Sequence, residues 1–182
     1  MNSILWFIAI LPPDDVAEKI RAIQQDIADR FGPRRALKIP VHITLESPFR
    51  FAEEDNVDLG IVLRDFFTGR QSFDLELRNF GTFRHDVIFV EVSPSLPLLE
   101  LQQALHSYLR IEKQVVEKSP WQGGYTPHVT VANRDVSAQQ HQLIWKEYNT
   151  RKFHARFRVS EISLLAHDGK VWQVRQRFAL MP

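Results

Sequence analysis

Hydrophobic and polar residues recur along this chain at two spacings, which together predict short strands separated by amphipathic helices. Residues 4–11 form a nearly continuous apolar run, typical of a strand in the centre of a sheet. Between residues 16 and 31, apolar residues recur at steps of three and four, as on the buried face of a helix. Pro12-Pro13 is expected to end the strand at residues 4–11. Asp14 or Asp15 is expected to cap the helix that follows, and Gly32-Pro33 to end it.

The rest of the pattern predicts more elements of the same two kinds. Further strands are expected at residues 37–45, 71–79, 87–92, 127–132, 152–166 and 171–179, the last two joined by an Asp168-Gly169 hairpin turn. Helices are expected from a cap at Asp55 or Asn56 to Gly69, over residues 98–109, and from a Ser137 cap to Tyr148. Ser47-Pro48 is expected to break the strand at 37–45, which places residues 49–51 in a loop, and residues 80–86 are expected to form a bent connection.

The order of these elements repeats. Strand, helix, strand, helix, strand is predicted for residues 4–79 and again for residues 87–166, with one extra strand at the end. We therefore predict an α+β fold of two pseudo-symmetric α/β lobes with mainly antiparallel sheets flanking a central cleft. Residues 1–182 are expected to be a single domain, with lobes at about 1–80 and 81–182.

Two short motifs occupy the same position in each repeat, and their histidines are 86 positions apart. The motifs are His42-Ile43-Thr44-Leu45 and His128-Val129-Thr130-Val131. Because successive side chains of a strand point to opposite faces, each His shares a face with its Thr while the apolar residues anchor the other face. Two such strands facing each other would line a cleft with two imidazoles and two hydroxyls.

Composition limits the alternatives. The chain has no cysteine, which excludes thiolate catalysis and disulfides and fits a cytoplasmic protein. Its formal net charge is +1, which gives no overall field for wrapping around long nucleic acid. The apolar run at residues 4–11 is too short for a membrane span and has no basic residue before it, so we interpret it as a buried strand and not as a signal peptide.

With both motifs in view, the chain resembles the 2H phosphoesterase superfamily, also called the 2′–5′ RNA ligase-like or cyclic phosphodiesterase family. Pro127 before the second His, the segment Phe80-Gly81-Thr82-Phe83 and the opening strand followed by a helix add to the likeness, which covers essentially the whole chain. The resemblance implies a LigT-like fold and metal-independent catalysis without a cofactor, by His42, Thr44, His128 and Thr130. The first motif continues with Glu46-Ser47-Pro48-Phe49, and after the second motif Asn133 stands between Ala132 and Arg134, so the residues typical of the RNA-specific branch do not carry over.

The chemistry of the four residues suits a cyclic phosphodiester. A neutral His can take a proton from the attacking water, a protonated His can donate to the leaving ribose oxygen, and the Thr hydroxyls can hydrogen-bond phosphate oxygens. The expected reaction is hydrolysis of a 2′,3′-cyclic phosphate of a nucleotide or RNA end to a 2′-phosphomonoester, with 2′–5′ ligation as its reverse. The alternatives are hydrolysis of another small phosphoester and a non-catalytic nucleotide- or RNA-binding module. The histidines could also be ordinary strand residues or ligands of a two-His metal site.

The sequence pattern points less directly to substrate-binding residues than to the four motif residues. Phe49, Phe83 and Tyr125 are candidates for nucleoside contact, with Phe80 and Trp121 as further aromatics that could instead belong to a core or a loop. Arg134 is expected to reach a phosphate. The basic segment with Arg34, Arg35 and Lys38 is either a solvated turn or a phosphate-binding edge. The partner is expected to be a small cyclic nucleotide or an RNA terminus, with no metal and no membrane, and the protein to be a monomer.

Overall fold

The computed structural model of the chain describes residues 4–51, 58–112, 115 and 124–182. Asp55, Asn56 and Trp121, which the sequence offered as helix caps and as a nucleoside contact, lie outside these residues. The strands are β1 (Ile4–Ile10), β2 (Ile43–Phe51), β3 (Phe73–Phe83), β4 (Val87–Val92), β5 (His128–Asn133), β6 (His154–Val159), β7 (Glu161–His167) and β8 (Trp172–Ala179). The helices are α1 (Asp14–Phe31), α2 (Leu59–Phe67), α3 (Leu96–Ser107) and α4 (Ala138–Tyr148), with a 3₁₀ turn at Arg35–Lys38 and a π-helical turn at Tyr108–Glu112.

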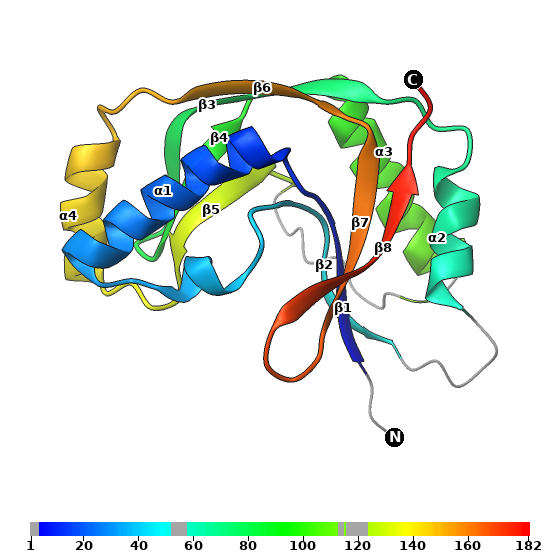
Figure 1. The fold of residues 1–182 in the computed structure, drawn as a ribbon, viewed down its shortest axis with the longest axis horizontal. Helices are drawn as coiled ribbons and strands as arrows, with labels where there is room; N and C mark the ends of the chain where they lie inside the picture. Colours follow the sequence, from blue (N-terminus) through cyan, green and yellow to red (C-terminus); the bar gives the residue numbers. More distant parts are fainter. Residues whose placement is uncertain (1–3, 52–57, 113–114, 116–123) are drawn as a thin grey trace.

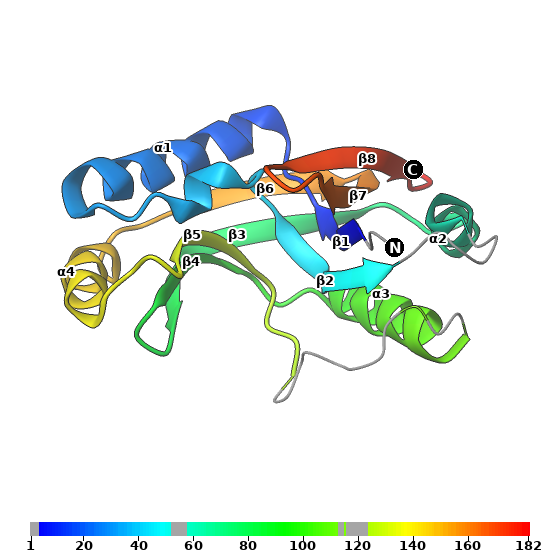
Figure 2. The same ribbon diagram turned by 90° about the horizontal axis from the view of Figure 1, so that it is seen from below.

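The strands form two antiparallel sheets, which confirms the predicted α+β class. One sheet has the order β2-β1-β7-β8 and the other the order β5-β4-β3-β6. The apolar strands β1 and β4 are central, as predicted, and each is flanked by a motif strand, β2 or β5, at the edge of its sheet. Both views place α1 and α4 at one end of the molecule and α2 and α3 at the other (Figures 1 and 2). The two edge strands β2 and β5 contact each other, which places the motifs at the boundary between the sheets.

The two sheets exchange strands across the predicted boundary near residue 80. β3, from the first repeat, joins the sheet of β4, β5 and β6, while β7 and β8 return to the sheet of β1 and β2. The sheets therefore do not coincide with sequence halves at about 1–80 and 81–182. The crossing occurs at Ser160, where the predicted strand 152–166 is in fact β6 and β7 in different sheets (Figure 1). β6 alternates between exposed and buried residues, whereas β7 is buried along its centre, which marks the change of environment.

The prediction that Ser47-Pro48 breaks the first motif strand was wrong. β2 starts at Ile43 and continues to Phe51, so residues 49–51 are in a strand and not in a loop. Residues 35–38 are a 3₁₀ turn and not the start of this strand. Pro48 lies at a register shift in an edge strand, where no ladder hydrogen bond needs its missing N–H. The strand therefore passes the proline that the sequence suggested would end it.

β3 also continues past its predicted end. Its pairing with β4 shifts register between Arg78 and Phe80, and Asn79 has φ 55°. Asparagine tolerates this left-handed conformation better than most residues, so the bulge bends β3 without ending it. Residues 80–83 are consequently strand, in contrast to the predicted connection.

Helix starts were predicted with mixed success. α4 begins with the expected Ser137 cap, which forms a capping box with Gln140. At α1 the cap position is Pro13. Asp14 and Asp15 lie in the first turn, where the positive end of the helix dipole stabilises their negative charge. α2 is capped by Asp58, whose carboxylate accepts hydrogen bonds from the N–H groups of Gly60 and Ile61. α3 ends at Ser107 and passes directly into the π-helical turn at Tyr108–Glu112, so the helical segment includes the predicted residues 108 and 109.

Candidate active site

The four motif residues line one cleft. His42 immediately precedes β2 and Thr44 is its second residue, while His128 and Thr130 come from the start of β5. The cleft has a volume of about 350 Å³. Because each motif strand is an edge strand and the two edges meet, residues far apart in the sequence share this space.

The alternation that the sequence predicted is present in both motifs. Ile43, Leu45, Val129 and Val131 are at most 1% exposed, and all four belong to the hydrophobic core. The His and Thr residues between them are partly exposed on the opposite face. The apolar residues thus anchor each motif strand while the polar residues face the cleft.

Each histidine ring is hydrogen-bonded to the backbone carbonyl oxygen of the residue two positions before it. His42 Nδ1 lies 2.7 Å from the carbonyl oxygen of Pro40, and His128 Nδ1 lies 2.8 Å from that of Thr126. A carbonyl oxygen can only accept, so each Nδ1 must carry a hydrogen. This fixes the tautomer and leaves Nε2 of each ring as the nitrogen that can take up or release a proton.

Aromatic rings surround both imidazoles. The Phe7 ring lies 5.0 Å from His42, and the rings of Phe83 and Phe89 lie 5.0 and 5.1 Å from His128. Gly81 makes room for Phe89, because a Cβ at position 81 would lie 2.5 Å from its Cε2. The Phe80-Gly81-Thr82-Phe83 segment therefore helps to build the wall behind His128.

Burial determines the proton affinity of the two histidines. It lowers the pKa of both rings from their ordinary value, since the charged form loses hydration. The backbone hydrogen bonds of His42 and His128 act in the opposite direction and raise each pKa. Repulsion from a charged His128 lowers the pKa of His42 further. Both rings are thus shifted toward the neutral form, in which Nε2 can accept a proton.

The other residues that line the cleft are apolar on one part of its surface and basic or polar on another. Leu5, Phe7, Ile39 and Trp172 supply apolar surface, and Trp172 packs edge-on against Phe7 with ring centroids 4.6 Å apart. Phe7 and Trp172 belong to a small apolar cluster separate from the main core. Arg35, Asn133 and Arg134 add basic and polar groups. The cleft can therefore hold a molecule with both an apolar and an anionic part.

Of the predicted substrate-binding residues, Arg134 lines the cleft directly. Phe83 is half-buried against the His128 ring. Tyr125 is half-buried and donates a hydrogen bond from its hydroxyl to the Thr44 carbonyl oxygen at 2.7 Å, and burial raises its pKa. Phe49 is 9% exposed and packs in the hydrophobic core, as does Phe80. In the basic turn, Arg35 lines the cleft, whereas Arg34 pairs with Asp29 at 3.0 Å.

Sequence reasoning missed Trp172, Phe7 and Gln24 as parts of the site. Trp172 was assigned to a half-exposed strand, and Phe7 to a central one, where an aromatic residue carries no special signal. Gln24 did leave a signal, since it lies four residues after Ile20 and three before Ile27 on the apolar face of α1. A polar residue on such a face requires a buried partner.

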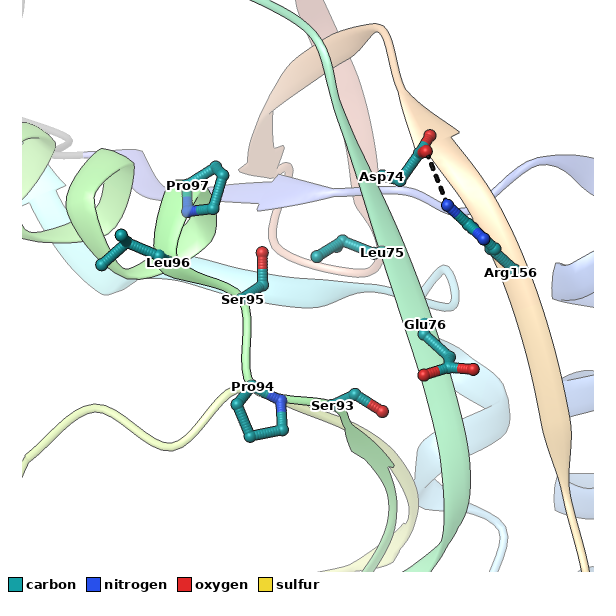
Figure 3. A pocket seen from close by; sticks show the side chains of 9 residues that line it. All are labelled: Asp74, Leu75, Glu76, Ser93, Pro94, Ser95, Leu96, Pro97 and Arg156. Atoms are coloured by element: carbon teal, nitrogen blue, oxygen red, sulfur yellow. Dashed lines mark hydrogen bonds and ion pairs between the residues drawn. The ribbon is translucent and has the colours of Figure 1, made fainter.

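A second hollow of about 420 Å³ lies between β3, β6 and the start of α3 (Figure 3). Its charged groups are already paired: Arg156 lies 3.0 Å from Asp74, and Glu76 bonds with Arg78 and His154. None of the four motif residues lines it. We therefore assign the candidate active site to the smaller cleft because of its chemistry.

Two further observations concern the described part of the chain. Within residues 4–51, 58–112, 115 and 124–182, no group of three or more His, Asp or Glu side chains is placed to hold a metal ion. Over the same residues, no helix has both the length and the apolar character needed to cross a membrane.

Comparison with known proteins decides the family. A sequence model of the 2′-5′ RNA ligase superfamily matches residues 12–171. The chain belongs to this superfamily. Its membership confirms the resemblance to 2H phosphoesterases inferred from the paired motifs, and it implies a phosphoesterase or RNA ligase-like activity.

Relatives of the superfamily match along nearly the whole chain. A protein of Bacillus pumilus, provisionally named a phosphoesterase, is 26% identical over 167 residues, which cover 90% of this chain and 92% of the relative. A similarly named protein of Bacillus cytotoxicus is 25% identical over 177 residues and 95% of both chains. The fold matches TT0787 of Thermus thermophilus with a TM-score of 0.71 at 20% identity, over 97% of both chains. It matches E. coli LigT in apo form with a TM-score of 0.67 at 20% identity, over 100% of both chains.

Proposed function

We propose that this 2H superfamily member is a metal-independent cyclic phosphodiesterase that hydrolyses the 2′,3′-cyclic phosphate of a nucleotide or RNA end to a 2′-phosphomonoester. The observation that carries the proposal is the pair of imidazoles with matching tautomers in one cleft, each beside a Thr of its own strand. Binding alone would not require two titratable rings, whereas acid–base catalysis does.

In the proposed reaction, His42 is the general base and His128 the general acid. Neutral His42 takes a proton from water at Nε2 as the water oxygen attacks phosphorus. The bond from phosphorus to the ribose O3′ breaks, and His128 Nε2–H gives its proton to O3′, so the phosphate remains on O2′. The assignment rests on burial, which is greater around the His42 ring than around the His128 ring and disfavours the charged form of His42 more. Run in reverse, the same steps join a 2′-phosphate to a hydroxyl, which is a ligation.

The neighbouring groups would bind the rest of the substrate. The hydroxyls of Thr44 and Thr130 donate to non-bridging phosphate oxygens, on which negative charge grows in the transition state. Arg35 and Arg134 supply positive charge at the edge of the cleft, and Trp172 supplies an aromatic face for a nucleobase. These three residues, with His42, Thr44, His128 and Thr130, form the proposed site. Phe83 and Tyr125 would act from behind it, by holding His128 and the Thr44 backbone.

The names of the matched proteins support this choice of substrate. E. coli LigT, whose fold the chain shares, has been crystallised with 3′-AMP, with ATP and with phosphate. The Bacillus relatives carry names of phosphoesterases. A cytoplasmic location and a monomeric state remain predictions.

A turnover screen tests the proposal. The purified protein is incubated in EDTA with the four nucleoside 2′,3′-cyclic phosphates, with RNA ending in a cyclic phosphate and with 2′–5′-linked dinucleotides. Products are separated so that 2′- and 3′-phosphates are distinguished. We expect 2′-phosphates from at least one cyclic substrate, with no gain on addition of divalent metal. Turnover only of other small phosphoesters, or saturable nucleotide binding without turnover, would contradict the proposal.

A further inference from the structure

Two side chains of α1 connect the segments that carry the catalytic histidines. The Arg21 guanidinium donates to the carbonyl oxygens of Leu37 at 3.1 Å and Ile39 at 3.2 Å, in the segment that leads to His42. It also donates to Gln24 Oε1 at 3.0 Å. Gln24 Nε2 in turn donates to the Thr130 carbonyl oxygen at 2.9 Å, in the strand of His128. One turn of α1 thus joins both sides of the cleft.

These hydrogen bonds fix the orientation of the Gln24 amide. Its oxygen is held by a cation and one Nε2 hydrogen by a carbonyl, so a rotation that exchanges oxygen and nitrogen would break both bonds. Gln24 is 3% exposed, yet it is among the residues that line the cleft with the two histidines and two threonines. Its second Nε2 hydrogen has no acceptor among the described residues.

A buried amide N–H without an acceptor beside two catalytic imidazoles is suited to an anion. We propose that Gln24 is a substrate-binding residue, whose second Nε2 hydrogen donates to a phosphoryl oxygen held between His42 and His128, and that Arg21 is the positioning residue that orients it. The inference rests on the proposed phosphodiesterase function for the identity of the anion. It adds a third donor, contributed by α1, to the two hydroxyls that the motif strands contribute.

Burial makes this donor effective. An N–H in a water-excluded site interacts more strongly with charge than one in water, and a fixed amide needs no reorganisation when the phosphate binds.

A second link joins the chain before His42 to the chain that carries His128. The Asp135 carboxylate accepts from the backbone N–H groups of Arg34 and Arg35 at 2.8 and 2.9 Å, which ties the turn before His42 to the segment after β5.

The test uses inorganic phosphate as the probe, with binding measured by calorimetry or by ³¹P NMR, alongside steady-state kinetics on the cyclic substrate. Gln24→Leu removes the amide at similar volume. Gln24→Glu keeps an acceptor for Arg21 but has no N–H. Gln25→Leu is the matched control, because Gln25 is the next residue on α1, is exposed, and bonds only with Asp29 among the described residues.

We expect Gln24→Leu to bind phosphate about 10- to 100-fold more weakly, the usual effect of losing one hydrogen bond to a charged group. Gln24→Glu should bind phosphate more weakly still, because its carboxylate also repels the anion. The loss should appear in KM more than in kcat, because the phosphoryl oxygens already carry charge in the ground state. Arg21→Lys, which cannot hold two carbonyls and the amide with one planar fork, should show a smaller loss of the same kind. Gln25→Leu should match the wild type.

Each result has a definite meaning. If the folded Gln24 variants keep wild-type phosphate affinity and KM, and lose only thermal stability, Gln24 is structural and the inference is overturned. Absence of saturable phosphate binding by the wild type would overturn it as well. Should Gln24→Leu fail to fold, Gln24→Met, which also removes the amide without adding a charge, carries the comparison. A wild type that binds phosphate but hydrolyses no cyclic phosphate would contradict the proposed function, while the binding data would still test Gln24.

Discussion

His42 and His128 lie close enough together that a proton on His128 lowers the pKa of the His42 imidazole. The repulsion is mutual, but burial, which lowers the pKa of both rings, is greater around His42 than around His128. When the pair holds one proton, that proton therefore resides on His128. The motifs are alike in sequence, but their surroundings differ, and the proposed roles of the two rings follow from that difference.

This difference predicts the pH dependence of activity. The rising limb of kcat/KM should follow deprotonation of His42, and the falling limb deprotonation of His128. Because both pKa values lie below the ordinary value of about 6.5, the optimum should lie on the acid side of neutrality. Rates from pH 4 to 9 at constant ionic strength check this. An optimum of kcat/KM above pH 7 would contradict the assignment.

Removal of either imidazole should abolish most of the activity. We expect His42→Ala and His128→Ala each to lower kcat by about 10²- to 10⁴-fold, the usual contribution of a positioned proton-transfer group. Melting temperatures should stay within a few degrees of the wild type. His154→Ala serves as the control, since His154 is an exposed residue paired with Glu76 and should leave kcat unchanged. Equal turnover by mutant and wild type would exclude the proposed mechanism.

The hydroxyls of the motifs can be tested without changing their shape. Thr44→Val and Thr130→Val keep the branched side chain that suits a strand and remove one donor to phosphate. We expect each to reduce kcat/KM by about 10- to 100-fold, as for the loss of one hydrogen bond to a charged group. Circular dichroism and melting curves establish that the sheet is intact. Unchanged kinetics in both variants would show that the hydroxyls do not contact the substrate.

The candidate site could be predicted because one local pattern carried both packing and chemistry. In each motif the alternation that buries Val129 or Ile43 also places the His and Thr on the other face, so strand geometry alone brings them together. The repeat then indicated that two such faces meet. Neither step needed knowledge of which strands pair.

Sheet membership could not be predicted for the same reason. Pairing between distant strands is not encoded in local alternation, so nothing marked Ser160 as the point where the chain changes sheets, or β3 as part of the second sheet. Pro48 and the segment at residues 80–86 were expected to end their strands, but β2 and β3 continue past the expected ends through shifts in register. Phe49 was consequently expected near the substrate, whereas strand β2 places it in the core.

Trp172 should determine how well the protein binds a nucleobase. Stacking of a base on an aromatic side chain is worth about 1–3 kcal/mol, so Trp172→Ala should raise KM for a nucleoside 2′,3′-cyclic phosphate by about 5- to 100-fold. The KM for methyl ribofuranoside 2′,3′-cyclic phosphate, which has no base, should change little. Trp172→Phe should retain most of the affinity, because it keeps an aromatic face. An equal effect on both substrates would indicate that Trp172 acts only by supporting Phe7.

A buried acid on the opposite side of β2 should make stability depend on pH. Glu46 is 1% exposed, and its carboxylate lies 2.7 Å from His106 Nδ1. Burial raises the pKa of Glu46, so the folded state holds a proton that the unfolded state releases near pH 4.3. Stability from this group must therefore fall as pH rises from about 4.3 to the higher folded pKa, and then stay constant.

Glu46→Gln removes this titration. We expect urea unfolding between pH 2 and 8 to show that, above about pH 4.3, the free energy of unfolding falls less with rising pH in the variant than in the wild type. Glu76→Gln is the opposite control. Hydrogen bonds from Arg78 and His154 lower the pKa of half-buried Glu76 to about 2, so its contribution to stability is present above pH 4.3 and is lost as pH falls toward 2. Parallel pH curves for wild type and Glu46→Gln would show that burial does not raise the proton affinity of Glu46 in the folded protein.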